Sequence, residues 1–366
     1  MPSLDLSQDV ASLTSALVDV YSESGHETEL ADLVEAALRE VAHLHVQRDG
    51  DAVVARTSLR REQRIVLGGH LDTVPPAANL PSRLEGRRLH GLGTGDMKSG
   101  VAVMLRLAAT IVAPGPDVTF VFYDGEEVEA ERNGLLRLSR VHPQWLAGDF
   151  AVLLEPTDAV LEGGCQGSVR VDVHVPGRRA HSARSWLGDN AIHAAEPVLT
   201  RLRGYVPREP VVEGLQFREG LNAVGIRGGV AGNVIPDECV VTINYRFAPD
   251  RSEVEAQAHL QELFDGYEVV VTDSSPAARP GLDHEVAQGL LAAVGGAPRA
   301  KFGWTDVARF NALGVPAVNY GPGDPSLSHT PGEYVDVEQV RDVEQRLRAW
   351  LSGPASGETN ASSASG

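Results

Sequence analysis

Short apolar runs alternate with helical patterns over the first half of the chain. Runs at 52–55, 64–69, 118–123 and 150–154 have the length and composition of buried β-strands. Between the second and third runs, the pattern predicts a helix at about 98–112. Strands that alternate with helices are typical of α/β folds, so we expect a mostly parallel sheet.

The N-terminal segment predicts helices, one of which has a defined start. Apolar residues at 30–41 repeat with helical spacing. Ser24 and Glu27 precede this stripe with the separation of a capping box, in which a serine hydroxyl binds the first free amides of a helix. We therefore expect this helix to begin directly after Ser24.

The pattern changes near Ser168. Apolar and polar residues alternate strictly at 169–175, and 240–247 also has two distinct faces. Helices are expected at about 189–202 and 252–264. Half-buried strands with helices on one side indicate a separate α+β unit of the ferredoxin-like kind.

After a segment rich in proline and glycine, 274–281, the α/β pattern resumes. It predicts helices at 283–294 and 336–351 and a strand at 315–320. The whole chain then divides into one domain built from 1–167 and 280–351, an inserted domain at 168–279, and a disordered tail rich in Ser, Gly and Ala at 352–366.

Composition narrows the classes of function. The chain has 32 basic against 50 acidic residues and a formal net charge of −18, which argues against binding to nucleic-acid phosphates or to an anionic membrane. No signal-peptide pattern and no apolar run of membrane-spanning length is visible, so a cytoplasmic location is expected. Cys165 and Cys239 are too few for a disulfide framework, and we expect both to be small buried hydrophobes.

Side chains suited to metal binding or acid–base chemistry stand at loop positions just past the strand-like runs. They are His70, Asp72, Asp96, Glu126, Glu127, Glu155 and His329. Imidazole and carboxylate form the ligand set that zinc accepts in catalytic sites. Ligands of open α/β sheets bind beyond the carboxyl ends of the strands, where most of these residues fall. Of two adjacent glutamates, one can bind metal while the other accepts a proton.

Each of these motifs alone also has an ordinary structural explanation. Asp96 could cap the helix that follows it. Glu126 and Glu127 could form an exposed acidic turn, and His329 could be a solvated loop histidine. A site is favoured because all the motifs fall at predicted strand ends or loops on the face where α/β enzymes work.

Six motifs, in this order, resemble those of the di-zinc aminoacylase and carboxypeptidase superfamily. They are H-L-D-T-V-P (70–75), G-T-G-D-M-K-S-G (93–100), D-G-E-E (124–127), L-E-P-T (154–157), R-A-H-S-A-R (179–184) and G-N-V-I-P-D (232–237). Within that superfamily, the segments 126–134, 302–310 and 319–325 are most similar to the actinobacterial succinyl-diaminopimelate desuccinylases. The resemblance extends from about residue 8 to residue 351.

The resemblance implies a di-zinc exopeptidase-like catalytic domain with an inserted lid and dimerisation domain. His70 and Glu155 would bind one zinc ion and Glu127 and His329 the other, with Asp96 bridging the two. Cobalt is an alternative metal. The peptide bond after Asp96 is expected to be cis.

The resemblance also implies roles around the metals. Glu126 would be the general base, and Asp72 would orient the imidazole of His70. His181 would cross a homodimer to stabilise the oxyanion in the partner's site. The substrate would be held by Asn233, Arg246, Gly303 and Thr305. His181 could also be an exposed loop histidine, and Arg246 a solvated strand arginine.

The reaction implied is hydrolysis of N-succinyl-LL-2,6-diaminopimelate to succinate and LL-2,6-diaminopimelate, in lysine and diaminopimelate synthesis. An acetylornithine deacetylase, another N-acyl-amino-acid amidohydrolase or a dipeptidase of the superfamily is the alternative, and a non-catalytic member is a third reading. Two departures bear on acyl specificity: Glu333 ends the segment T-P-G-E where relatives more often have a basic residue, and Trp304 is bulkier than in many relatives. The expected partner is a small-molecule substrate, with no nucleic acid and no membrane.

Overall fold

The computed structural model describes residues 3–353 and contains two compact units. The first unit contains the chain up to Gly163, together with Pro280–Arg299 and the part from Asp306 onward. The second contains Gly164–Arg279 and the short segment Ala300–Thr305. Of the tail predicted to be disordered at 352–366, the part from residue 354 lies outside the described residues.

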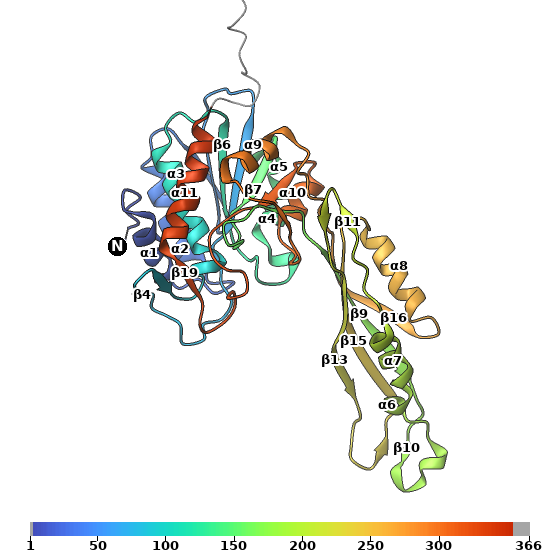
Figure 1. The fold of residues 1–366 in the computed structure, drawn as a ribbon. Coiled ribbons are helices and arrows are strands. Elements are labelled where there is room, and N and C mark those ends of the chain that lie inside the picture. The colour runs from blue at the N-terminus through green and yellow to red at the C-terminus, as the bar shows by residue number, and fades with distance from the viewer. Residues whose placement is uncertain (1–2, 354–366) are drawn as a thin grey trace, which may run out of the picture. The chain divides into compact units, whose positions relative to one another are not determined.

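An eight-stranded sheet forms the centre of the first unit (Figure 1). Its strands in spatial order are β1 (His45–Asp49), β2 (Ala52–Arg56), β6 (Asp117–Tyr123), β3 (Arg64–His70), β7 (Phe150–Leu153), β18 (Ala317–Asn319), β8 (Glu162–Gly163) and β17 (Arg299–Ala300). The four strands β6, β3, β7 and β18 run parallel, whereas β2 and β8 pair antiparallel with them. The predicted α/β class with a mostly parallel sheet is confirmed.

Helices cover both faces of this sheet. One layer consists of α1 (Val10–Val18), α2 (Thr28–Arg39), α3 (Ser99–Thr110), α9 (Glu285–Val294) and α11 (Val337–Ser352). The other consists of α4 (Gly134–Val141), α5 (Pro143–Leu146) and α10 (Val307–Ala312). A small sheet of β4 (Arg83–Glu85), β5 (Arg88–His90) and β19 (Tyr334–Asp336) lies beside it. Within residues 3–353, no helix is both long and apolar enough to cross a membrane.

Two glycines let the central strand β3 end close to its neighbours. A Cβ added to Gly68 would lie 2.5 Å from a methyl carbon of Leu153, and one added to Gly69 would lie 2.7 Å from the methyl carbon of Met97. Neither distance is tolerable between carbon atoms. The glycines therefore allow the Met97 loop to pack against the end of the strand, directly before His70.

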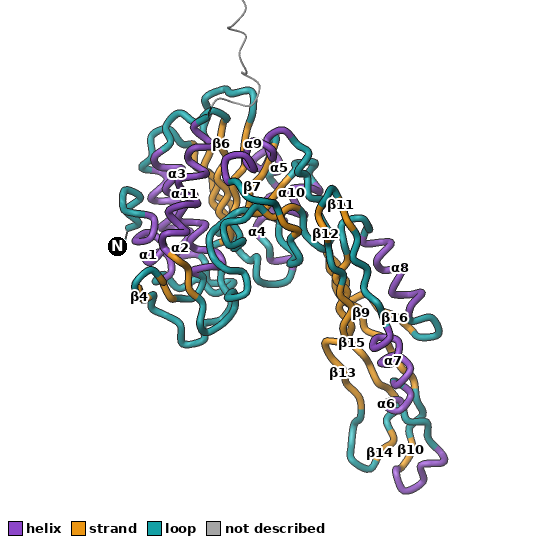
Figure 2. The backbone as a smooth tube through the Cα atoms, viewed as in Figure 1, coloured by secondary structure: helices purple, strands orange, loops and turns teal. Residues whose placement is uncertain are grey.

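The second unit is built on a four-stranded antiparallel sheet. Its order is β13 (Gly220–Gly228), β15 (Glu238–Phe247), β9 (Gly167–Pro176) and β16 (Glu268–Ser275). The alternating valines of β9 are buried against helices α6 (Ala191–Ala194), α7 (Glu196–Gly204) and α8 (Glu253–Leu263). Short pairs of strands complete the unit: β10 (Ala180–His181) with β14 (Val234–Ile235), and β11 (Val211–Val212) with β12 (Leu215–Gln216) (Figure 2).

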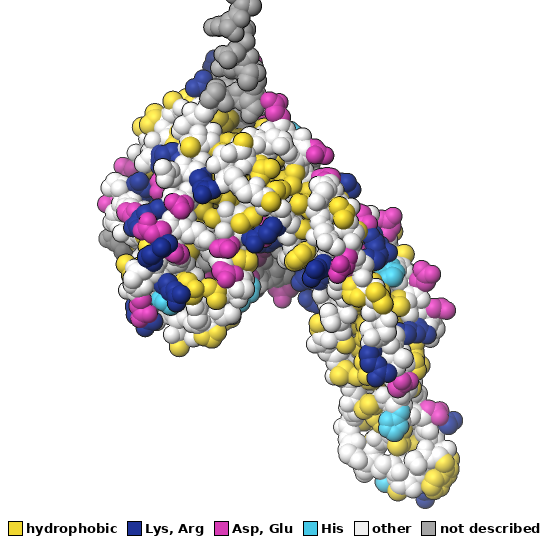
Figure 3. Space-filling model, viewed as in Figure 1, with side chains coloured by type: hydrophobic (Ala, Val, Ile, Leu, Met, Phe, Trp, Pro, Cys, Tyr) yellow, Lys and Arg dark blue, Asp and Glu magenta, His cyan; other side chains and the backbone are white. Residues whose placement is uncertain are grey.

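Two details of this unit bear on the sequence predictions. The single helix predicted at 189–202 is wrong, because the structure has two helices that meet at Ala195. Pro197 stands in the first turn of the second helix, where its missing N–H does no harm, but it would have broken a continuous helix. Cys165 and Cys239 are both buried, as predicted. On the face drawn in Figure 3, acidic and basic side chains are interspersed.

A candidate metal centre at the sheet edge

The carboxyl ends of three adjacent parallel strands bring the predicted site residues together. His70 is the last residue of β3, Glu126 and Glu127 follow β6, and Glu155 follows β7. Asp96 comes from the loop before α3, where a left-handed Gly93 (φ 75°) begins the turn. The bond from Asp96 to Met97 is cis, as expected.

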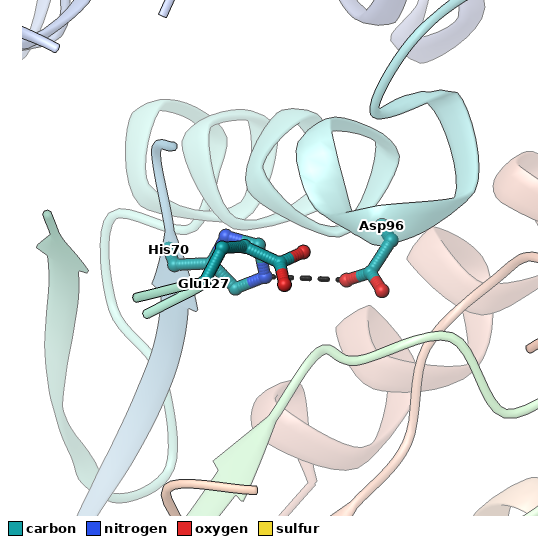
Figure 4. A group of neighbouring side chains, drawn as sticks. All are labelled: His70, Asp96 and Glu127. Atoms are coloured by element: carbon teal, nitrogen blue, oxygen red, sulfur yellow. Dashed lines mark hydrogen bonds and ion pairs between the residues drawn. The ribbon is translucent and has the colours of Figure 1, made fainter. Parts of the chain in front are cut away.

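Three of these side chains form a tight group. The potential ligand atoms of His70, Asp96 and Glu127 all lie within 4.8 Å of one another (Figure 4). Nε2 of His70 is 3.2 Å from Oδ1 of Asp96. On the other side, Nε2 of His329 is 2.7 Å from Oε1 of Glu127 and 3.5 Å from Oδ2 of Asp96. The two oxygens of Asp96 thus face two different imidazoles, which is the arrangement that a carboxylate shared by two metal ions requires.

Glu155 lies outside this tight group but acts on it. Its side chain is buried, at 4% exposure, and its charge contributes to raising the pKa values of both His70 and Glu126. Imidazoles and carboxylates at such separations fit a divalent cation, and zinc takes this mixture of nitrogen and oxygen ligands. The structure therefore gathers every predicted ligand into one region of the first unit.

Burial and neighbouring charges shift the pKa values of the central groups. Burial alone would lower the pKa of His70, but the carboxylates of Asp72 and Asp96 raise it well above its usual range. Burial raises the pKa of Glu126 well above that of an ordinary glutamate, with Glu155 and Glu127 adding to the shift against the opposing charge of His70. A carboxylate in such surroundings takes up a proton readily, as a general base must.

Asp72 does more than the sequence suggested. Its carboxylate accepts hydrogen bonds from the backbone N–H groups of Glu126 (3.0 Å) and Glu127 (3.1 Å), and it is fully buried. Nδ1 of His70 lies 2.9 Å from the Asp72 backbone oxygen and 3.5 Å from its carboxylate. One aspartate thus orients both the imidazole and the loop that carries the two glutamates. This second function depends on backbone amides, which the sequence alone does not locate.

The predicted capping box at Ser24 is wrong, because its two side chains form hydrogen bonds with residues far away in the chain. Helix α2 begins at Thr28, and Glu27 at its start makes no side-chain cap. The Ser24 hydroxyl instead donates to Asp72 (2.7 Å), and Oε1 of Glu27 accepts from the N–H of Gly125 (3.2 Å). Both side chains are used to support the loops of the site, and these long-range partners outweigh the local cap.

Glu333 is a functional candidate that sequence reasoning noted only as a departure. It is 2% exposed, and its Oε1 accepts from the N–H groups of Gly95 (2.8 Å) and Asp96 (3.1 Å), while Oε2 accepts from Gly93 (3.0 Å). Glu333 follows His329 by four residues, so it ties the His329 loop to the Asp96 loop. Burial raises its pKa to about 7. The only signal in the sequence was an acidic residue four positions after the predicted ligand His329.

The remaining predicted residues lie in the second unit and fall into two places. His181 and Asn233 are neighbours: β10 pairs with β14, and the N–H of Ser182 donates to the Asn233 carbonyl (2.9 Å). Both side chains are exposed. Arg246, eight residues along β15 from Glu238, is about 26 Å further along the sheet. The structure does not bring Arg246 together with the His181 pair.

Gly303 and Thr305 lie at the Arg246 end of the second unit. The Thr305 carbonyl accepts from Sγ of Cys165 (3.7 Å), and Cys165 stands just before β9. In the sheet, Ser168 of β9 faces Arg246 of β15. Gly303 is exposed, whereas Thr305 is buried.

Comparisons with known proteins agree with this arrangement. A Mycobacterium tuberculosis protein with a provisional assignment as succinyl-diaminopimelate desuccinylase is 55% identical over 353 residues, covering 96% of this chain and 100% of the relative. The succinyl-diaminopimelate desuccinylase of Corynebacterium glutamicum is 47% identical over 362 residues, covering 96% and 98%. A dinuclear metal-binding peptidase of the M20 family from Bacillus subtilis shares the fold, with a TM-score of 0.68 at 16% identity, covering 94% and 96%.

An α/β unit whose strand ends gather imidazoles and carboxylates around one central aspartate is that of a metal-dependent hydrolase. The sequence model of peptidase family M20/M25/M40 matches residues 66–352. The chain belongs to this family of hydrolases.

Proposed function

We propose that this protein hydrolyses N-succinyl-LL-2,6-diaminopimelate to succinate and LL-2,6-diaminopimelate. The observation that carries the proposal is the near full-length similarity to the two actinobacterial relatives described above. The geometry of the first unit supports it, because His70, Asp96 and Glu127 form one tight group and the charges of His70, Glu127 and Glu155 act on Glu126. Lysine and diaminopimelate synthesis in the cytoplasm is the corresponding pathway and location.

We further propose zinc as the metal, with two ions per chain. His70 and Glu155 would hold one ion, Glu127 and His329 the other, and Asp96 both. When bound, the ions supply Lewis acidity toward the scissile carbonyl and the attacking water. Cobalt, which accepts similar ligands, is the alternative metal.

The residues of the chain would then move one proton through the reaction. Glu126 takes a proton from the attacking water and returns it to the departing amine. Asp72 keeps Glu126 in place through its backbone N–H, at 3.0 Å. Neither residue needs to bind metal for these roles.

We propose that His181 stabilises the oxyanion in the active site of a second copy of the chain. Support comes from the second unit, in which about 26 Å of strand separates the His181 end from the end that carries Arg246 and Thr305. A single molecule of N-succinyl-LL-2,6-diaminopimelate is too short to contact both ends at once. A two-fold dimer would allow the His181 end of one chain to complete the site of the other.

Mixing two inactive chains tests this arrangement. A His181→Ala chain and a Glu126→Gln chain should each be inactive alone, but a hybrid dimer would contain one site with an intact Glu126 and an intact His181. Activity should return to as much as a quarter of the unaltered level, since about half of the dimers are hybrids and each has one complete site. If subunit exchange is demonstrated and no activity returns, His181 does not act in trans.

Substrate specificity is assigned to Arg246, Gly303 and Thr305 of one chain, and to Asn233 of a second copy, since Asn233 lies at the His181 end. A chain with a net charge of −18 repels an anionic substrate unless local cations offset the repulsion. Arg246 is exposed on the sheet of the second unit, and a guanidinium grips a carboxylate through two parallel hydrogen bonds.

A substrate panel tests the proposed function. With zinc-loaded protein, kcat/KM should be highest for N-succinyl-LL-2,6-diaminopimelate, and at least tenfold lower for acetylornithine and for dipeptides. Arg246→Lys should reduce kcat/KM for the succinylated substrate by roughly tenfold to hundredfold, through loss of a charge-assisted hydrogen bond. Its effect should be smaller on a substrate without the distal carboxylate. Preferential turnover of acetylornithine or of a dipeptide would replace the proposal with that activity.

A further inference from the structure

The first unit carries a groove at the opposite end of the sheet strands from the candidate metal centre. Its volume of about 570 Å³ lies within the range of roughly 300–1,000 Å³ that is usual for small-molecule sites. It lies where β1 begins, β2 ends and β3 begins, and its polar lining consists of Arg39, His45, Gln47, Arg56, Ser58 and Arg64. Arg64 precedes His70 by six strand positions, or about 20 Å. Within the described part of the chain, no carboxylate lines this groove.

The guanidinium of Arg56 is the unusual group in the groove. Its Nε is buried, and within residues 3–353 this atom has no hydrogen-bond partner. The carboxylate of Asp117 acts on Arg56 from nearby but is already committed: Oδ1 accepts from the Thr57 hydroxyl (2.7 Å) and the Leu59 N–H (2.8 Å), and Oδ2 from the Arg61 N–H (3.0 Å). A buried donor without an acceptor calls for a bound water or ion.

A second guanidinium stands beside the same aspartate. Arg64 is held by hydrogen bonds to the Thr119 hydroxyl (3.2 Å) and the Thr57 carbonyl (3.2 Å), and its Nη2 forms an ion pair with Oδ2 of Asp117 (3.5 Å). Burial and the charge of Arg64 together lower the pKa of Arg56. Two guanidinium groups thus share the carboxylate of Asp117, which leaves a local excess of positive charge on a chain whose net charge is −18. An anion between them would satisfy the free donor and offset the repulsion.

We propose that this groove binds a small molecule through an oxyanion, a phosphate-type or carboxylate group, with Arg56 and Arg64 as its anchors. The planar guanidinium matches both kinds of oxyanion through paired hydrogen bonds. The Ser58 hydroxyl and the Gln47 amide line the same groove and add neutral donors. This site is separate from the candidate metal centre and does not depend on the proposed hydrolysis.

Equilibrium dialysis with labelled sulfate tests the site. The zinc-loaded protein is dialysed against sodium sulfate, with sodium chloride keeping the ionic strength constant. Arg56→Met should weaken sulfate binding by roughly tenfold to hundredfold, the usual effect of losing a charge-assisted contact. Arg140→Gln removes the same charge from an exposed position on α4 and should leave binding unchanged. Displacement of sulfate by acetate would identify a carboxylate ligand, and its failure a tetrahedral one; either result supports an oxyanion site.

Melting curves separate binding from a structural role. In chloride buffer without sulfate, Arg56→Met should melt no lower than the unaltered protein, because within residues 3–353 Arg56 makes no ion pair of its own and the nearby Asp117 is paired with Arg64. Arg56→Lys keeps the charge and serves if the methionine variant does not fold; it should bind sulfate more weakly than arginine does. The proposal is overturned if the Arg56 variants and Arg140→Gln bind sulfate equally. It is also overturned if Arg56→Met lowers the melting temperature in chloride alone.

Discussion

Glu126→Gln should reduce turnover by roughly 10²–10⁴-fold while leaving the metal content unchanged. Glutamine is isosteric with glutamate but cannot accept the proton of water or return it to the departing amine. The two proton transfers are lost together, so the effect should fall near the upper end of that range. Steady-state kinetics with the succinylated substrate, together with metal analysis of the same preparation, would measure it.

The adjacent acidic segment offers a matched control. Glu129 is three residues from Glu126 and exposed, so Glu129→Gln removes the same charge without touching the candidate metal centre. Its turnover should stay within about twofold of the unaltered protein, since isolated surface changes have small effects. Turnover of Glu126→Gln within a few-fold of normal would exclude Glu126 as the proton carrier. Loss of metal from that variant would instead make Glu126 a ligand.

Glu333→Ala should weaken metal binding by about tenfold to hundredfold, although Glu333 is not a proposed ligand. The substitution removes the acceptor for the backbone N–H groups of Gly93, Gly95 and Asp96 at once. The loop that carries Asp96, the proposed bridging ligand, then loses its fixed position relative to the His329 loop. Zinc titration against a competing chelator would give the affinity, and circular dichroism would confirm that the chain is folded.

A graded series distinguishes positioning from general destabilisation. Glu333→Gln keeps one acceptor oxygen, so it can satisfy part of the amide set, and its zinc affinity should fall between those of the unaltered and the alanine proteins. Glu268→Ala removes an exposed glutamate from the second unit and should leave zinc affinity unchanged. Equal zinc affinity for Glu333→Ala and the unaltered protein would show that the hydrogen bonds between Glu333 and the Asp96 loop do not affect metal binding.

Most of the fold was predictable because its signals are local. The run at 64–69 lies within β3, which is buried from Ile65 onward, and the strict alternation at 169–175 lies within β9. The positions of His70 and Glu127 at neighbouring strand ends follow from the parallel order, so their proximity could be anticipated. What the sequence could not show were hydrogen bonds between side chains and distant backbone amides.

Three residues illustrate that difficulty. Ser24 had a local partner of the right kind but bonds to Asp72, 48 positions away. Asp72 was expected to orient an imidazole, and its bonds to the Glu126 loop depend on how β6 ends. Glu333 looked like a substitution relevant to specificity, since nothing in its neighbourhood reveals the amides it accepts. A competition between local and distant partners can be decided only when the chain is folded.

The hydrogen bonds that Glu333 accepts from the Asp96 loop have a consequence for when the protein can bind metal during its synthesis. Asp96 and Glu333 are separated by 237 positions in the chain. At a synthesis rate of about 5–20 residues per second, the Asp96 loop leaves the ribosome roughly 10–50 s before Glu333 does. During this interval the nascent chain has His70, Asp96 and Glu127 but lacks the histidine and the carboxylate that hold them together. We therefore expect tight metal uptake to follow release of the finished chain, and a premature stop anywhere before residue 329 to yield a product that cannot retain metal, however well its sheet has formed.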